Sequence, residues 1–280
     1  MIELPEAILI STQINDTLIG KTIKSAIRGQ TPHKFAFIGK HSDEEVSQIL
    51  KGKKIKKSWS NGNIILVQMD PDYLLSLGCG GERILYHEQD KSIPKRHQLL
   101  LEFKDKTYLT VTVYGWGEVR LIELKNIDKH PHIQFDKIDP LSEEFTFNTF
   151  EELIQKIPEK KKCSAKKFCI TEPGVRGIGN GVIHDIFFLS KIHPKIEMKS
   201  LTKEELKLLY KTIRNELHKM VTLGGRDSEK DIFDNYGKYK RIMHSKSAGT
   251  PCSICGTLIK KQQYLGGTIY FCPSCQKIDR

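Results

Sequence analysis

CSIC at residues 252–255, followed by CPSC at residues 272–275, is the most informative part of this 280-residue sequence. Two C-x2-C pairs separated by 16 residues match the spacing of sites in which four thiolates bind one zinc ion. The residues between the pairs are apolar and β-branched around Gly266-Gly267, which predicts a β-hairpin with its turn at the two glycines. Two disulfides or unrelated buried cysteines are the alternative. The expected ligands of one structural zinc ion are Cys252, Cys255, Cys272 and Cys275.

The composition favours an intracellular protein with a polyanionic partner. Lys and Arg outnumber Asp and Glu by 45 to 34, and the formal net charge of +11 favours nucleic acid over a merely basic soluble protein. No apolar run is long enough to cross a bilayer, and the N-terminus lacks a signal-peptide pattern. We therefore expect a cytoplasmic protein, associated with the nucleoid if the source is bacterial. The other cysteines are expected as reduced thiols: Cys79, Cys163 and Cys169.

Residues 1–135 are predicted to be mostly β. Short apolar or alternating runs at residues 64–67, 99–103 and 108–113 predict strands, and glycine, asparagine and lysine residues between them predict turns. Residues 44–50 predict one short helix. The length of the chain as a whole suggests about two domains.

A different pattern begins at Asp139-Pro140, and the residues that follow predict helices. Capping boxes starting at Asn148 and Thr202 predict two helix starts. Residues 182–189 predict an apolar helix, and the polar, basic residues 226–247 predict a linker or mobile loop before the hairpin. After the second capping box, apolar residues recur at helical spacing and predict a core-facing stripe: Leu206, Leu209, Tyr210, Ile213, Leu217 and Val221.

Three separated stretches together resemble the formamidopyrimidine-DNA glycosylase / endonuclease VIII family. They are ELPE at residues 3–6, GIGN at 177–180 followed by IHP at 192–194, and the cysteine-bearing stretch 251–276. Their order and spacing extend over essentially the whole chain. The last two stretches are specific, so the resemblance covers both the helical part and the predicted zinc hairpin.

The resemblance implies a multidomain α+β fold. It places an N-terminal β-sandwich of the catalytic type at residues 1–135, a helix–two-turn–helix DNA-binding domain at 136–245 and a C-terminal zinc-finger β-hairpin at 246–280. It also implies that DNA binds in the cleft between the halves. The order of β, helical and hairpin segments agrees with the prediction made from the residues alone.

The resemblance also implies a nucleophile at the N-terminus. In the family, the amine of an N-terminal proline attacks C1′ of a damaged nucleotide, expels the base and forms a Schiff base. Here that position is Ile2, whose amine is exposed only if Met1 is removed, and removal before a branched residue is expected to be poor. If Met1 stays, its own amine lies up to about 3.8 Å away. Glu3 is the expected proton-transfer residue, and Glu6 also matches the family.

Several positions that face the lesion in the family have changed here. The family's catalytic lysine aligns with Asn63, its wedge methionine with Cys79 and its zinc-finger arginine with Gly267. Cys79 is therefore a candidate wedge, with a small buried apolar residue as the alternative. These losses affect chemistry and lesion clamping more than the scaffold.

Other DNA-contacting positions are retained. Trp116 keeps an aromatic wedge, and its alternative is an ordinary core or surface aromatic. Asn180 is the expected ligand of the DNA backbone, because Gly177 and Gly179 allow close approach to a phosphate, and its alternative is an ordinary turn and helix cap. Lys167 lies where a phosphate-binding lysine is expected. Affinity for DNA comes largely from phosphate contacts and can survive the losses above.

The resemblance supports two main functional hypotheses. The leading one is a DNA-repair glycosylase with AP-lyase activity on oxidised or ring-opened bases or abasic sites, acting as a monomer on double-stranded DNA. The alternative is a catalytically inactive relative that binds damaged or bent DNA, or structured RNA. A zinc-stabilised protein-interaction module without nucleic-acid function is a third hypothesis. No membrane partner is expected.

Overall fold

The computed structural model describes residues 1–29, 31, 33–36, 41–78, 80–133, 135–172 and 174–278. The chain forms two compact units. Unit 1 comprises Met1–Ile133 and Leu223–Lys238, and unit 2 comprises Gln134–Thr222 and Tyr239–Arg280. Residues 223–238, which the sequence suggested as part of the helical segment, thus belong to the β-rich unit. Among the described residues, no helix combines the length and apolarity that crossing a membrane requires.

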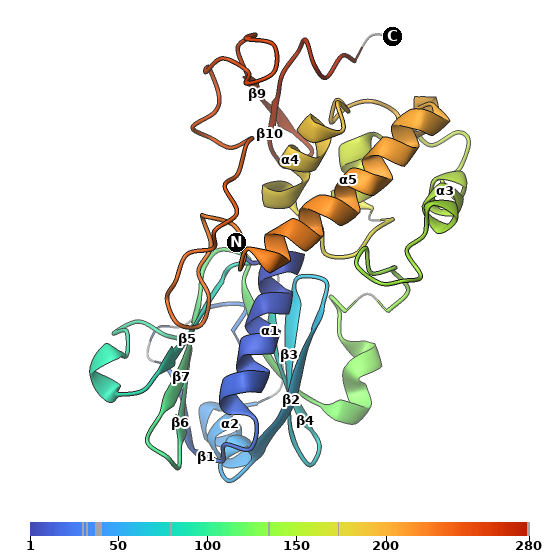
Figure 1. The fold of residues 1–280 in the computed structure, drawn as a ribbon. Helices are drawn as coiled ribbons and strands as arrows, with labels where there is room; N and C mark the ends of the chain where they lie inside the picture. Colours follow the sequence, from blue (N-terminus) through green and yellow to red (C-terminus); the bar gives the residue numbers. More distant parts are fainter. Residues whose placement is uncertain are drawn as a thin grey trace. The chain divides into compact units, whose positions relative to one another are not determined.

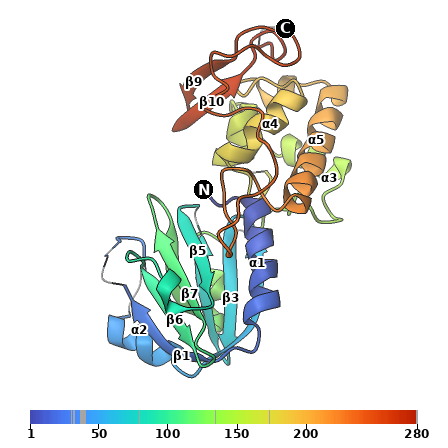
Figure 2. The ribbon, with the colours of Figure 1, turned by 60° about the vertical axis from the view of Figure 1, so that its left-hand side comes forward.

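Unit 1 contains two four-stranded antiparallel sheets among its described residues. One sheet has the order β2-β3-β4-β8 and the other β1-β6-β7-β5, with β7, β6 and β1 seen side by side in Figure 2. The strands are β1 (Ile23–Arg28), β2 (Lys54–Asn61), β3 (Ile64–Asp70), β4 (Tyr73–Gly78), β5 (Glu82–His87), β6 (Leu99–Phe103), β7 (Tyr108–Val113) and β8 (Glu118–Glu123). The three predicted strands are β3, β6 and β7.

One core joins the two sheets of unit 1. Ile65 and Leu77 are direct neighbours in the β3–β4 register, and both are fully buried in the same cluster as Leu101 and Val111 of the other sheet. Burial of such a side chain contributes roughly 1.5–3 kcal/mol. The shared core makes the pair of sheets a sandwich, as the fold prediction required.

Helix α1 (Leu4–Leu18) was not predicted from the sequence, which we interpreted as mostly β up to residue 135. The helix runs alongside β2 and β3 (Figure 1). Ala7, Ile10, Ile14 and Leu18 recur at helical spacing and are buried in the unit 1 core. The other helical segments of the unit are α2 (Asp43–Leu50) and the 3-10 turns η1 (Asp90–Ser92) and η2 (Leu124–Lys129).

Unit 2 combines helices with a terminal hairpin. Its helical segments are α3 (Phe147–Gln155), the π-turn η3 (Lys167–Thr171), α4 (Asn180–Leu189), the 3-10 turn η4 (Met198–Ser200) and α5 (Lys203–Thr222). The capping box at Thr202 is confirmed, because Thr202 N donates to Glu205 Oε2 and Glu205 N donates to Thr202 Oγ1. The first box was placed wrongly: α3 begins after Thr146, two residues before the predicted Asn148.

The predicted hairpin is present as β9 (Lys260–Tyr264) and β10 (Gly267–Phe271). Its turn is one residue earlier than predicted, at Leu265-Gly266, and both residues have positive φ (49° and 69°). A two-residue turn of this kind matches the twist of the strands. Gly267 therefore starts β10, where it pairs with Tyr264.

Candidate functional site

Two buried glutamates stand at the start of helix α1. Glu3 is the N-cap residue, and its backbone N–H donates to Glu6 Oε2 at 3.1 Å. The side chains are only 3% and 2% exposed. Acidic groups at a helix N-terminus are stabilised by the orphan amide groups and the helix dipole. The ELPE stretch is therefore both a helix start and a cluster of two carboxyl groups held out of solvent.

Arg226 is the buried partner of both carboxyl groups, and the sequence offered no signal for it. Its Nε and Nη2 donate to the two oxygens of Glu6 at 2.9 and 2.6 Å, and its backbone N donates to Glu6 Oε1 at 3.0 Å. Its Nη1 lies 3.4 Å from Glu3 Oε1. Burial by itself would raise the pKa of Glu6, but the charge and hydrogen bonds of Arg226 outweigh burial and lower that pKa.

The first two residues of the chain are held by unit 1. The Ile2 N–H donates to the carbonyl of Gly80 at 3.1 Å, and the Ile2 side chain is 4% exposed. The Met1 ammonium is paired with Glu229, and the Met1 carbonyl accepts from Arg226 Nη2 at 2.7 Å. Gly80 has a φ of 97°, and a Cβ there would lie 2.5 Å from Met1 Cγ. A glycine is needed for this close approach.

Glu82 is a further buried carboxyl group near the N-terminus. It accepts from Gly80 N at 3.1 Å and from Glu118 N at 2.6 Å, and so connects the turn before β5 to the start of β8. Burial raises the pKa of Glu82 to about 8, although both hydrogen bonds act in the opposite direction. Cys79, the proposed wedge, lies outside the described residues.

Trp116 projects from the turn between β7 and β8 and is 73% exposed. Its ring stacks on Phe35 with centroids 5.5 Å apart, and Lys34 Nζ lies 5.4 Å from its centroid. An exposed aromatic with a lysine beside it suits stacking on a nucleobase. Asn63, at the position of the family lysine, lies in the turn between β2 and β3 and is half-buried.

In unit 2, Asn180 is the first residue of helix α4. Its Oδ1 is buried and has no hydrogen-bond partner within the described part of the chain. Lys166 is a lysine neighbour of Asn180, since a Cβ on Gly267 would lie 3.1 Å from Asn180 Nδ2 and 3.3 Å from Lys166 Nζ. Lys167 Nζ instead lies 3.4 Å from Glu172. The role of Lys167 at a phosphate remains a prediction.

Lys166 is fully buried, and burial lowers its pKa. Its ammonium donates to the carbonyl of Tyr264 at 2.6 Å, in the strand of the hairpin that precedes the turn. A Cβ on Gly267 would thus lie closer than an ordinary van der Waals contact to the side-chain ends of Asn180 and Lys166, which would have to shift by a few tenths of an ångström.

A second cation is placed beside Asn180 by the segment that leads to the hairpin. Asp185 of α4 accepts from Ile242 N at 2.9 Å and Met243 N at 2.7 Å. Arg241 precedes this anchored pair and lines the same cavity as Asn180, with a volume of about 270 Å³. Burial raises the pKa of Asp185 to about 6.

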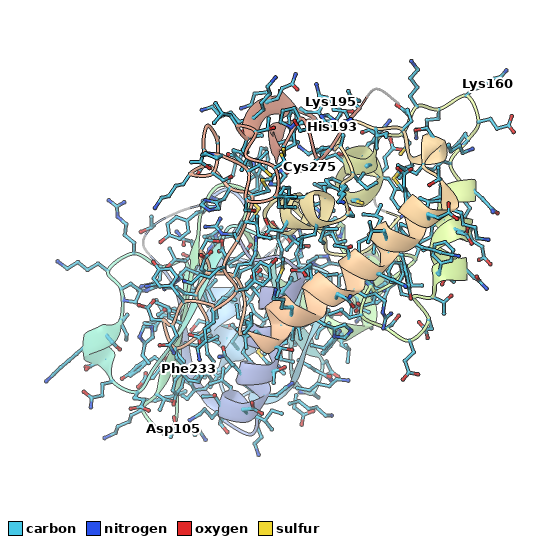
Figure 3. All side chains as sticks on the ribbon, turned by 45° about the horizontal axis from the view of Figure 1, so that its top comes forward. Asp105, Lys160, His193, Lys195, Phe233 and Cys275 are labelled. Carbon is cyan, nitrogen blue, oxygen red and sulfur yellow. The ribbon has the colours of Figure 1, made fainter. Side chains whose placement is uncertain are left out.

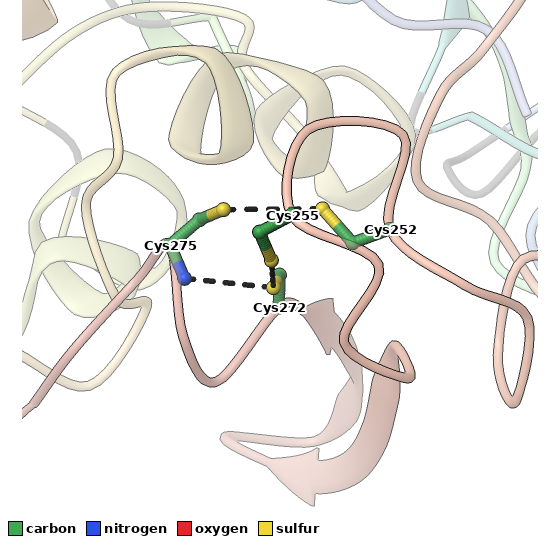
Figure 4. A group of neighbouring side chains, drawn as sticks. All are labelled: Cys252, Cys255, Cys272 and Cys275. Atoms are coloured by element: carbon green, nitrogen blue, oxygen red, sulfur yellow. Dashed lines mark hydrogen bonds between the residues drawn. The ribbon is translucent and has the colours of Figure 1, made fainter.

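The four predicted metal ligands lie together at the hairpin. Their Sγ atoms are all within 4.8 Å of one another, and Figure 4 shows the two pairs facing each other. The distances are 3.9 Å between Cys252 and Cys275 and 3.4 Å between Cys255 and Cys272. A tetrahedron with Zn–S bonds of about 2.3 Å has S–S edges of about 3.8 Å. Four thiolates in this geometry form a site that suits structural zinc.

The hairpin is fastened to the IHP stretch of unit 2. Gln276 Nε2 donates to the Ile192 carbonyl at 2.8 Å, and the rings of His193 and Phe271 are 4.5 Å apart. Lys195 Nζ lies 5.1 Å from the ring centroid of Tyr264. Figure 3 shows His193 and Lys195 close to Cys275. Packing against the helical part thus supports the metal site.

Two family models match most of the chain. The model described as the formamidopyrimidine-DNA glycosylase N-terminal domain matches residues 1–113, and the model of the formamidopyrimidine-DNA glycosylase H2TH domain matches residues 137–231. The second model includes Arg226 as well as Asn180.

Curated relatives and solved structures agree with these models. The chain is 28% identical to the formamidopyrimidine-DNA glycosylases of Halalkalibacterium halodurans and Cytobacillus firmus, over 99% of this chain and 100% of each relative. It is similar to wild-type Lactococcus lactis Fpg (MutM) in complex with DNA containing an oxidised pyrimidine, with a TM-score of 0.82, 25% identity and coverage of 98% and 99% of the two chains. The L. lactis Fpg complex with abasic-site DNA matches with the same values. By fold, motifs and sequence, the chain belongs to the formamidopyrimidine-DNA glycosylase family.

Proposed function

We propose that this protein is a DNA glycosylase with AP-lyase activity, which removes oxidised or ring-opened bases and cuts the strand at the resulting abasic site. The observation that carries the proposal is the match to formamidopyrimidine-DNA glycosylases over the whole length of both chains. The similar structures hold DNA with an oxidised pyrimidine or an abasic site. In the bacterial setting of these relatives, the protein acts in the cytoplasm, as a monomer on duplex DNA.

The chemistry requires a neutral N-terminal amine and a proton carrier. The amine nitrogen attacks C1′ of a flipped-out nucleotide while the C1′–N bond to the base breaks, and the base leaves with one amine proton. The C1′–O4′ bond then breaks to give a protonated imine, and O4′ takes a proton carried by Glu3. Loss of a C2′ proton expels the 3′ phosphate and cuts the strand. Glu6 holds Glu3 and Arg226 in place for these steps.

The nucleophile is the α-amine at Ile2 after removal of Met1, or the α-amine of Met1 itself when that residue is kept. The first alternative reproduces the family position. The second is supported by two contacts that hold Met1, at Arg226 and Gly80, and it requires that the ion pair of the Met1 ammonium with Glu229 opens and the amine loses a proton. With Met1 in place, the nitrogen of Ile2 is an amide that donates to Gly80 and cannot attack C1′.

The proposed DNA contacts come from both units. In unit 2, Asn180 and Lys167 bind backbone phosphates, and the position of Arg241 beside Asn180 supports it as the substitute for the missing zinc-finger arginine. In unit 1, the exposed ring of Trp116 fills the space left by the flipped nucleotide. Cys79 remains a proposed second wedge.

Borohydride trapping combined with intact-mass spectrometry tests the proposal. The purified protein is incubated with duplexes containing an abasic site, an oxidised pyrimidine or a ring-opened purine. A covalent adduct that is lost in Glu3→Gln supports the enzyme, and peptide mapping of the adduct identifies residue 1 or 2 as the nucleophile. Glu44→Gln, at an exposed position on α2, is the matched control. No adduct with any of these duplexes would refute the lyase.

A catalytically inactive DNA-binding relative is the second candidate. The specific observations in its favour are the buried Ile2 side chain and the loss of the family's lysine and arginine at Asn63 and Gly267. Tight, salt-dependent binding of an abasic duplex without any adduct would favour it.

A further inference from the structure

We infer that Arg226 is a positioning residue of the reaction, which sets the place of Glu3 and of the first residue through one planar guanidinium. The inference rests on the proposed function, because it assigns Arg226 to the same N-terminal site. It assigns the segment that follows α5 to the catalytic apparatus of unit 1, where the sequence suggested a linker or mobile loop.

The contacts of Arg226 extend in three directions. Nε and Nη2 donate hydrogen bonds to the two carboxylate oxygens of Glu6. Nη1 lies 3.4 Å from Glu3 Oε1, and Nη2 also donates to the Met1 carbonyl at 2.7 Å. The residue is 2% exposed. Only a guanidinium offers five donors in one rigid plane, so a lysine ammonium cannot reproduce this set of contacts.

The electrostatic balance explains why the arginine is buried at all. Burial would lower the pKa of Arg226, but the neighbouring carboxylates of Glu3 and Glu6 outweigh burial and raise it. The guanidinium is therefore always charged, and it compensates two acids that are almost fully out of water. Glu229, which pairs with the Met1 ammonium, adds a third acid to the same cluster.

The backbone brings Arg226 to this place through two glycines. Gly224 and Gly225 have φ values of 70° and 89°, which a side chain would strain. A Cβ on Gly225 would also lie 3.4 Å from Glu6 Oε1. The turn after α5 thus passes directly over Glu6 and delivers the Arg226 side chain to the cluster. The path of the backbone at this turn and the ion pairs of Arg226 with Glu3 and Glu6 thus both place the guanidinium at the N-terminal site.

A charge-conserving variant separates positioning from charge. Arg226→Lys keeps the positive charge but loses the planar set of N–H donors. Because a lysine cannot contact Glu6, Glu3 and Met1 together, Glu3 and the first residue should be displaced. Displacement of reacting groups by about an ångström costs on the order of a hundredfold in rate. We expect borohydride trapping to slow by about that factor while abasic-duplex affinity changes little. Arg120→Lys is the matched control, because Arg120 makes a two-pronged pair with Glu118 elsewhere in unit 1.

Chemical rescue distinguishes positioning from general support of the fold. Arg226→Ala leaves a space shaped for a guanidinium. Added ethylguanidinium should therefore raise the trapping rate of this variant by at least about tenfold. Ethylammonium carries the same charge without the planar fork and should not restore it. If Arg226→Ala does not fold, the double variant Glu6→Gln/Arg226→Gln removes the Glu6–Arg226 ion pair as a unit, and its trapping rate should fall like that of Arg226→Lys. Equal trapping by wild type and either variant would overturn the inference.

Hydrogen exchange makes the inference independent of activity. In Arg226→Lys, the peptide covering residues 1–10 should exchange faster than in wild type, with no change in the strands of unit 1. If wild type forms no adduct, the proposed function fails, and exchange alone then decides whether Arg226 holds the N-terminal carboxylates. Unchanged exchange in residues 1–10 would overturn the inference in either case.

Discussion

At the scale of single residues, two buried carboxyl groups of unit 1 have opposite pKa shifts because their partners differ. Glu6 has a charged guanidinium against both oxygens, and its pKa is lowered in spite of burial. Within the described part of the chain, the donors to Glu82 are backbone N–H groups, so burial dominates and raises its pKa to about 8. Near neutral pH, Glu6 is therefore an anion, whereas Glu82 keeps its proton up to about pH 8.

The raised pKa of Glu82 predicts a stability that falls as pH rises. In the unfolded chain Glu82 loses its proton near the ordinary pKa of 4.5, whereas in the folded protein it keeps the proton up to about pH 8. The free energy of unfolding therefore declines between these two pH values and levels off above the second. We expect Glu82→Gln to lack this decline. Between pH 6.5 and 8, the wild type should lose on the order of 1–2 kcal/mol relative to the variant.

Urea denaturation at half-unit pH steps measures this difference. Histidine titration cancels in the comparison because wild type and variant carry the same histidines, including His130 and His184, whose pKa values burial lowers to about 4. Parallel stability curves for the two proteins would show that Glu82 is ionised throughout this range.

At the scale of elements, the hairpin of β9 and β10 depends on its metal site. Two strands of five residues are marginal in water without further support. The four cysteines flank the hairpin, and Ile254 N and Cys275 N lie 3.4 and 3.5 Å from the sulfurs of Cys252 and Cys272. We therefore expect metal binding to stabilise the hairpin more than the apolar contacts between its two strands do.

Removal of the metal should unfold this element selectively. Cys272→Ser, or chelation of the wild type, is expected to lower bound zinc below one ion per chain and to abolish exchange protection in β9 and β10. The affinity for DNA should fall with it, because Gly267 packs on Asn180 and Lys166. Cys163→Ser, a buried free thiol outside the site, is the control. Full zinc content in Cys272→Ser would contradict the assignment of this ligand.

At the scale of the whole molecule, the net charge of +11 favours a phosphate backbone as partner. Within unit 2, Lys166, Asn180 and Arg241 gather cationic and amide groups at one end of α4, whose N-terminus adds the positive end of its dipole. The fold itself is similar to that of L. lactis Fpg, with a TM-score of 0.82 at 25% identity.

Salt dependence of duplex binding tests the proposed role of Arg241. Each phosphate contact contributes about 0.9 to the slope of log K against log salt concentration. Arg241→Ala should reduce that slope by about this amount and weaken binding of all duplexes similarly. Lys211→Ala, an exposed cation on α5, removes the same charge away from the cavity and should change the slope less. Equal slopes for the two variants would remove Arg241 from the interface.

The local features of this protein were determined by the sequence itself. The cysteine spacing predicted the metal site, alternating apolar residues predicted β3, β6 and β7, and the capping box at Thr202 predicted the start of α5. Each of these signals acts through near neighbours along the chain or through a fixed periodicity. The same local logic erred by one or two residues at the hairpin turn and at α3, where several adjacent residues satisfy the pattern.

The chemistry of the site was decided only by the tertiary structure. Arg226 meets Glu6 across 220 residues of sequence, and Gly80 is a close neighbour of Met1. The sequence does not show which of the adjacent lysines 166 and 167 is buried, and in the structure it is Lys166, next to Asn180 and Gly267. The physical reason is that burial and long-range charge pairing depend on which surfaces pack together, and neither leaves a periodic mark on the chain.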